Sequence, residues 1–183
     1  MITAEQLDDL WRDGLRNGRR VGLTVASDSM APLIYAGDRI IVEPYEHGEQ
    51  PRLGDIVLFD SDGHWVVHRI IGRSGRGSGA EYRQKGDAGF NAMTSPAMTV
   101  AGRVTRIEKR GGARIDLRGR HQLVNGFLGR FFYALDLLRR LGERSDGSAV
   151  AGGETSAVRL AAARLLRWLE RTAARIGAYL MRK

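Results

Sequence analysis

The chain has 183 residues, 43% of them hydrophobic and 27% charged, a composition typical of one folded core with appended segments. It contains no cysteine, which excludes disulfides, a thiolate nucleophile and cysteine-ligated metal centres. The net charge of +8 is uneven, because residues 1–100 carry 11 Lys and Arg against 14 Asp and Glu, whereas residues 101–183 carry 18 against 7. The basic C-terminal part could therefore contact anionic lipid, nucleic acid or an acidic protein, or place solvated arginines on exposed helix faces.

Residues 1–20 are predicted to form an N-terminal helical segment. Thr3 is a candidate N-cap, and apolar residues recur at helical spacing over 4–17, which indicates a helix acting as a lid or brace. The segment lacks the basic start and continuous apolar stretch of a secretory signal, and no apolar run approaches the ~18–20 residues that span a bilayer. We therefore expect a cytoplasmic protein, with peripheral membrane association as an option.

Residues 21–112 change to short β-branched runs punctuated by glycine, which is typical of an all-β barrel or sandwich. The expected strands are VGLTVA, RIIVEPY, DIVLFDS, HWVVHRIIG, EYRQKG and VAGRVTRIEKR. Glycine and aspartate between them supply turn conformations that bulkier residues resist. The segment RSGRGSGA, residues 73–80, is expected to be a flexible hairpin connection.

The C-terminal third is predicted to be helical, with an extension over 113–142, a Gly- and Ser-rich linker over 143–156 and a basic amphipathic helix over 157–183. One face of this last helix is apolar: Val158, Ala162, Leu165, Leu169, Ile176 and Leu180. Another is cationic: Arg164, Arg167, Arg171 and Arg175. Such a helix either packs on its own protein or lies on an anionic membrane surface.

Few residues could carry chemistry. A serine needs a base to take its proton, and His68 is a candidate base because a histidine exchanges protons near neutral pH. Strand alternation would place His64, Val66 and His68 on one face and Trp65, Val67 and Arg69 on the other; Asp87 could orient the imidazole. By residue type alone, a turn capped by Ser27-Asp28 and a half-buried strand histidine explain the same pattern. The four histidines lack a metal-ligand spacing, so no metal site or cofactor is predicted.

Three blocks in order, SDSMAPLIYAGDRIIVEP, LGDIVLFDSDGHWVVHRIIG and YRQKGDAG, resemble the signal peptidase family of serine proteases (S24/S26 type). In that family Ser-x-Ser-Met-x-Pro precedes two Gly-Asp strand starts, a catalytic base followed by Arg, and Lys-Gly-Asp. The resemblance covers about residues 21–108. It implies a mainly β fold, with a signal-peptidase/LexA-like β-barrel-type core, a short N-terminal helix and C-terminal α-helices.

The resemblance also implies a role for each matching residue. Ser29 corresponds to the nucleophile, and the Ser27 hydroxyl to an oxyanion-hole donor beside the Ser29 N–H. His68 occupies the base position, as in the endoplasmic-reticulum, archaeal and sporulation-type branch, and Asp87 would support it directly or shape its surroundings. Supporting positions are Met30, Pro32, Asp38, Arg69 and Gly86. Lys85 follows the family's base position and is the less favoured base.

Two departures from the family pattern remain. The histidine branch carries a further aspartate soon after Lys-Gly-Asp, but AGFNAMTSPAM contains no acid. The third catalytic member therefore stays open between Asp87, a Ser–His dyad and loss of catalysis. The usual N-terminal membrane anchor is also missing, so we expect action on a dedicated substrate.

The leading hypothesis is a serine endopeptidase that removes a leader or signal-like segment from a protein or peptide substrate. One alternative is a LexA-like self-cleaving regulator, although those proteins use lysine as base and carry an N-terminal DNA-binding domain. A second is a catalytically inactive module that binds through its basic C-terminal helices, with anionic membrane contact through residues 157–183. Nucleic acid is not favoured, because no aromatic-rich binding strand or recognition helix supports it.

Overall fold

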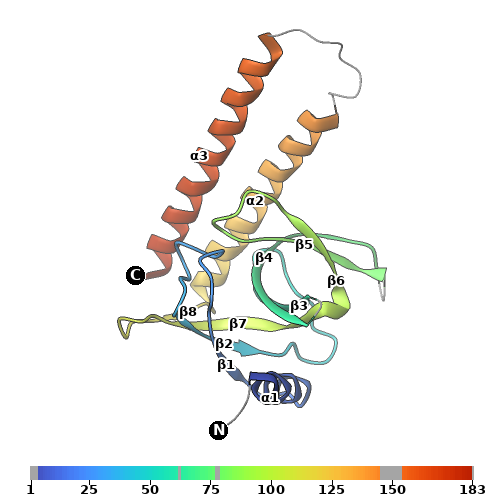
Figure 1. Cartoon of the computed structure of the whole chain (residues 1–183), viewed down its shortest axis with the longest axis vertical. Coiled ribbons are helices and arrows are strands. Elements are labelled where there is room, and N and C mark those ends of the chain that lie inside the picture. The colour runs from blue at the N-terminus through green and yellow to red at the C-terminus, as the bar shows by residue number, and fades with distance from the viewer. Residues whose placement is uncertain (1–3, 62, 77–78, 145–153, 183) are drawn as a thin grey trace.

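The structure is a computed structural model that describes residues 4–61, 63–76, 79–144 and 154–182. Within these residues eight strands form one curled antiparallel sheet, with a short helix at one end and a long helical hairpin rising from the other (Figure 1). The predicted mainly β fold class with N- and C-terminal helices is confirmed.

The elements follow one another as α1 (Ala4–Arg16), β1 (Val21–Thr24), β2 (Arg39–Glu43), β3 (Ile56–Ser61), β4 (His64–Ser74), β5 (Glu81–Lys85), β6 (Met93–Pro96), the 3-10 helix η2 (Ala97–Thr99), β7 (Val100–Glu108), β8 (Arg114–Asp116), α2 (Arg120–Arg144) and α3 (Glu154–Arg182). The strands pair in the order β1-β2-β7-β3-β4-β5-β6, and β8 pairs with β7. Irregularities in register interrupt β2–β7, β3–β7 and β4–β5. Bulges of this kind bend strands, which accounts for the curl of the sheet.

Both faces of β3 are buried, because the sheet curls around it. Ile56 and Leu58 belong to the main core, whereas Val57 and Phe59 belong to a second cluster. Strand alternation produces this division. The neighbouring strand β4 follows the same division of faces. His68 pairs with Val57 and therefore lies on the face of the second cluster.

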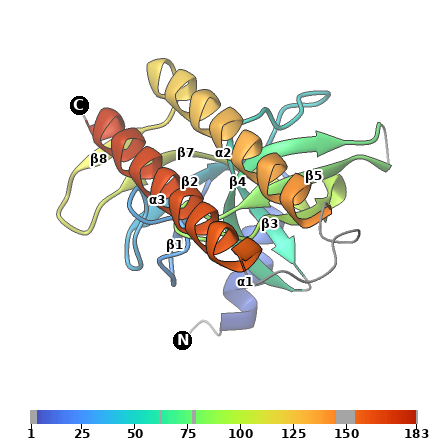
Figure 2. The same cartoon turned by 90° about the horizontal axis from the view of Figure 1, so that it is seen from above.

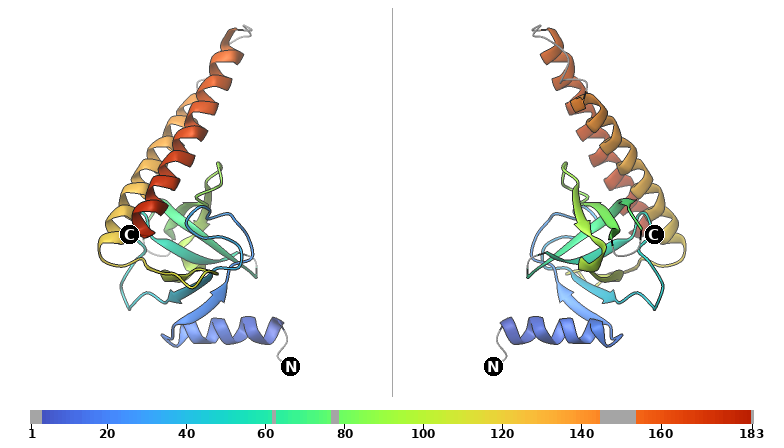
Figure 3. Two further views of the ribbon diagram at one scale, coloured as in Figure 1. Left: turned by 90° about the vertical axis from the view of Figure 1, so that its left-hand side faces the viewer. Right: turned by 90° about the vertical axis from the view of Figure 1, so that its right-hand side faces the viewer.

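The helices α2 and α3 run side by side, and α2 packs against β4 (Figures 2 and 3). They pack closely, since a Cβ on Gly177 would lie 2.4 Å from a methyl carbon of Leu128. The buried positions of α3 are Glu170, Ala174, Gly177, Ala178 and Met181. The apolar face singled out in the sequence is mostly exposed in the structure. Ala162, Leu165, Ile176 and Leu180 are exposed, Leu169 is half-buried, and the Val158 side chain lies outside the described residues.

The predicted strand runs contain β1, β2, β3, β5 and β7, whereas β6 and β8 were not predicted. The run predicted for β4 ends at Gly72, but the strand continues to Ser74, so the first two residues of the expected hairpin connection are strand. Strands β6 and β8 are short, at four and three residues, and have mostly exposed side chains, so they carry little of the hydrophobic pattern that identifies a strand. Residues 77–78 of the expected hairpin connection and 145–153 of the expected linker lie outside the described residues. Within the described ranges, no helix has both the length and the hydropathy needed to cross a bilayer.

Candidate active site

Ser29 lies in the loop between β1 and β2, here called the serine loop. Buried residues of this loop hold it in place. Met30 is 1% exposed and belongs to the main core, and its carbonyl accepts a hydrogen bond from the Ile34 N–H. The Asp28 carboxylate accepts a 2.7 Å hydrogen bond from the Ala36 N–H, and the Ala31–Pro32 peptide bond is cis. Ser29 itself is half-buried, with its hydroxyl 3.5 Å from the Ser27 hydroxyl.

Asp38 closes the same loop. Its carboxylate accepts hydrogen bonds from the Tyr35 N–H at 2.8 Å, from the Arg110 N–H at 3.2 Å and from the Lys109 ammonium. Burial alone would raise the pKa of Asp38, but the hydrogen bonds outweigh it, and the pKa is lowered. The Gly-Asp pair of the sequence motif thus fixes the end of the loop that presents Ser29.

His68 lies on β4, and its ring is oriented by β5. Its Nδ1 lies 2.5 Å from Oε1 of Gln84, whose Nε2 donates a 2.8 Å hydrogen bond to the Ser95 hydroxyl. Because an amide oxygen only accepts, this contact favours the tautomer with the proton on Nδ1 and the lone pair on Nε2. Burial lowers the pKa of His68, against the raising effects of the Gln84 hydrogen bond and the Asp87 charge. The ring is therefore neutral, and a proton acceptor, at pH 7.

Gly86 brings the serine loop and His68 together. A Cβ at Gly86 would lie 2.4 Å from the Ser29 carbonyl oxygen and 3.2 Å from Nε2 of His68. The Ser29 carbonyl also accepts a 3.0 Å hydrogen bond from the Ala88 N–H. Nε2 thus points toward the serine loop, across a position where only glycine leaves enough room.

Asp87 lies on the other face, where it pairs with Arg69. Two parallel hydrogen bonds of 2.8 and 2.7 Å join the carboxylate to the guanidinium, and both side chains are almost completely buried. Arg69 also donates to the Gly54 carbonyl at 3.0 Å and to Asn125 Oδ1 at 2.6 Å. Of the two roles considered for Asp87, this geometry favours the indirect one, because the partner of His68 Nδ1 is Gln84.

Lys85 is turned away from Ser29 and toward the helical hairpin. Its ammonium donates to the carbonyls of Gly86 at 3.2 Å and Gly89 at 2.6 Å, lies 4.5 Å from the centre of the Phe132 ring and 4.0 Å from Glu170. Burial lowers the pKa of Lys85, opposed by the charge of Glu170. These contacts give Lys85 the role of a buried brace behind the Gly86 loop.

Ser27, Ser29 and His68 line one cavity of about 360 Å³. Apolar side chains form most of its remaining wall, among them Trp11 of α1 and Trp65 of β4. An extended peptide with an apolar side chain suits such a wall. Within the described ranges, no group of three or more His, Cys, Asp or Glu is placed to hold a metal ion.

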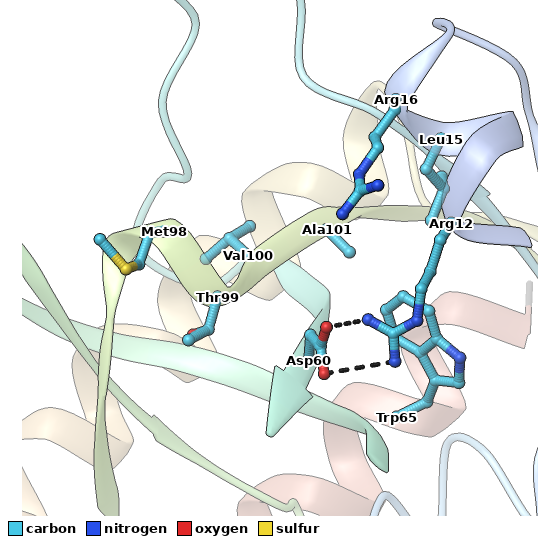
Figure 4. Close-up of a pocket in the computed structure, with 9 residues that line it drawn as sticks. All are labelled: Arg12, Leu15, Arg16, Asp60, Trp65, Met98, Thr99, Val100 and Ala101. Carbon is cyan, nitrogen blue, oxygen red and sulfur yellow. Dashed lines mark hydrogen bonds and ion pairs between the residues drawn. The ribbon is translucent and has the colours of Figure 1, made fainter. Parts of the chain in front are cut away.

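The helix α1 is fixed beside this cavity through Arg12. Its guanidinium lies 4.5 Å from the centre of the Trp65 ring and forms an ion pair with Asp60 (Figure 4). The Trp65 indole N–H donates to Asp8, one turn before Arg12 on α1. A second cavity of about 220 Å³ lies along this contact, and Trp65 lines both cavities. These contacts attach α1 to β3 and β4, which favours the brace over the lid, the two roles expected for the N-terminal helix.

Residues 4–78 match the model of the Peptidase S24-like family. This chain is similar to that family over the segment that holds Ser29 and His68. The Peptidase S24-like match supports the peptidase resemblance at the level of the S24/S26 families, without assigning the signal peptidase branch. No curated protein matches the chain.

The residue absent from the predicted site is Gln84. Its signal was present in YRQKGD, because Gln84 and Gly86 alternate with Lys85 and Asp87 along the strand direction. Since Lys85 pairs with Arg69 in the register, Gln84 and Gly86 fall on the His68 face and Asp87 on the Arg69 face. Alternation along β5 separates the two sets, but only the register with β4 shows which set lies on the His68 face.

Proposed function

We propose that the protein is a serine endopeptidase of the S24/S26 type, in which Ser29 is the nucleophile and His68 the general base. A histidine at the base position supports the histidine-base, signal-peptidase-like branch, and a leader or signal-like segment of a protein or peptide is the proposed substrate. The observation that carries the proposal is the ring orientation: Gln84 holds the proton on Nδ1 of His68, while Nε2 faces the serine loop across Gly86.

The reaction would proceed by acyl transfer. Nε2 takes the Ser29 hydroxyl proton as the oxygen attacks the scissile carbonyl, and the Ser27 hydroxyl stabilises the negative charge that develops on the carbonyl oxygen. The C–N bond then breaks, and the imidazolium returns its proton to the leaving amine. Water, deprotonated by the same nitrogen, hydrolyses the acyl-enzyme and regenerates Ser29.

The test is covalent labelling with a fluorophosphonate and a penem, read by intact mass on the wild type, Ser29→Ala, His68→Ala and the control Ser61→Ala. The proposal expects one adduct on the wild type and the control, none on Ser29→Ala and at least a hundred-fold slower labelling of His68→Ala. An adduct that survives Ser29→Ala would refute the assignment of the nucleophile.

Self-cleavage in the manner of LexA is the second candidate, favoured by the Peptidase S24-like match. Lys85 argues against a lysine base, since its ammonium is bonded to two carbonyls and 1% exposed. Incubation at protein concentrations spanning a hundred-fold range separates the two: intramolecular cleavage has a half-time independent of concentration.

A further inference from the structure

The outer face of the α2–α3 hairpin is apolar and takes no part in the proposed chemistry. Eight large apolar side chains on it are between 48% and 78% exposed: Leu123, Phe127, Leu138, Leu141, Leu165, Trp168, Ile176 and Leu180. A groove of about 320 Å³ runs between the two helices on this face. Solvent-exposed apolar surfaces of this extent mark interaction sites.

The residues of this face follow one another at intervals of one helical turn, which makes the face continuous. They are Leu123, Phe127 and Phe131 on α2, and Thr172, Ile176 and Leu180 on α3. The buried positions of α3 lie on the opposite side, because Glu170, Ala174 and Met181 face the sheet and its loops, here called the β body. The inner face of α3 therefore packs against the sheet and its loops, while the outer face is exposed to solvent.

A cationic flank borders the apolar face along α3. Arg164, Arg171 and Arg175 recur at helical spacing on the side between the inner and outer faces, and α3 as a whole has six arginines against two glutamates. Arg171 lies 5.2 Å from the Phe90 ring centre. Long side chains at such a border can rest their stems on apolar surface and extend their charges to a neighbouring anionic layer.

We propose that the outer face of the hairpin binds the surface of a bilayer containing anionic lipids. The apolar side chains of the outer face would insert at the boundary between headgroups and acyl chains. The cationic flank would contact lipid phosphates. The helices would lie in the interface, since neither has the hydropathy of a spanning segment. Charge complementarity favours this partner over a second copy, because pairing two outer faces would bring two arginine flanks together. Trp168, 60% exposed on this face, is a residue type enriched at membrane interfaces.

The test uses the full chain with vesicles of pure phosphatidylcholine and of phosphatidylcholine with about 30% phosphatidylglycerol, read by flotation. We expect partitioning at least about ten-fold stronger on the anionic vesicles, weakening as salt rises. Arg164→Glu/Arg175→Glu and Leu165→Glu/Trp168→Glu should each lower it at least about ten-fold. Both pairs are exposed, and glutamate is a good helix former, so folding is retained.

Matched controls lie on the β body. Arg76→Glu/Arg106→Glu makes the same charge change at exposed positions, and Met98→Glu replaces an 84% exposed apolar side chain. Both should partition like the wild type. Absence of binding to anionic vesicles, or equal loss in the controls, would overturn the proposal. So would lipid-free dimers that Leu165→Glu/Trp168→Glu dissociates, or saturable binding of an acidic protein in preference to the vesicles.

Discussion

His68 and Gln84 form a diagonal pair across β4 and β5, with Nδ1 and Oε1 2.5 Å apart on the face away from the Arg69–Asp87 ion pair. The imidazole is therefore oriented by a neutral amide, which leaves its pKa lowered by burial.

This pair predicts opposite pH shifts for two variants. Gln84→Ala removes a contact that raises the pKa of His68, so the acid limb of the labelling rate should move to lower pH. Loss of ring orientation should also slow the plateau roughly ten- to hundred-fold. Gln84→Glu supplies a negative charge that raises the same pKa, so the limb should move to higher pH. Rates of fluorophosphonate labelling from pH 4 to 9 measure both, and shifts of the same sign would contradict the assigned role of Gln84.

Gly86→Ala should impair catalysis more than stability. The added Cβ would stand 2.4 Å from the Ser29 carbonyl oxygen, so the serine loop and His68 must separate. Misplacement of about 1 Å costs on the order of a hundred-fold in rate. Gly89→Ala is the matched control, because its nearest outside atom lies at an ordinary 3.5 Å. Equal labelling rates for the two variants would show that the close approach has no catalytic consequence.

Asp87→Ala should act through stability. Removing it leaves the Arg69 guanidinium at 0% exposure without a counter-charge, a change that costs about 3–5 kcal/mol in the free energy of unfolding. Arg39→Ala, which removes a 56% exposed side chain from a 3.5 Å pair with Glu108, should cost less than about 1 kcal/mol. Urea unfolding compares them. A small stability loss with abolished labelling would instead make Asp87 a catalytic member.

Asp38 predicts a loss of stability in acid. Its folded-state pKa is lowered, so its stabilising effect is fully present above the unfolded value of about 3.9 and disappears as pH falls through the folded value. In Asp38→Asn this part of the pH dependence should vanish, and the variant should be less stable than the wild type at pH 7. Urea midpoints between pH 2 and 7 provide the measurement. A wild-type slope retained in Asp38→Asn would assign the acid sensitivity to another carboxylate.

Much of the fold followed from local pattern. Glycine-bounded, β-branched runs identified six strands because burial on alternating faces imposes a period of two. The same rule failed for β6, whose Met93–Pro96 side chains are mostly exposed.

The motif order singled out Ser29 and His68. The partner of the His68 Nδ1 atom depended on which residue of β5 pairs with β4, and that register is a tertiary property. For α3, small residues such as Ala174 and Ala178 form the packed face, because close helix contact favours them over the larger residues of the more apolar stripe.

The helix α3 contacts both the segment around Gly86 and the serine loop. Glu170 lies against Lys85, next to Gly86, and the Arg182 guanidinium donates a 3.2 Å hydrogen bond to the Pro32 carbonyl in the serine loop. A truncation designed from the 4–78 match, or from the end of the sheet, would remove both supports, and with them the core residues Leu128 and Phe132 of α2. The smallest piece of this chain that can be expressed as a working unit therefore extends to the last turn of α3, however far its sequence lies from the motifs.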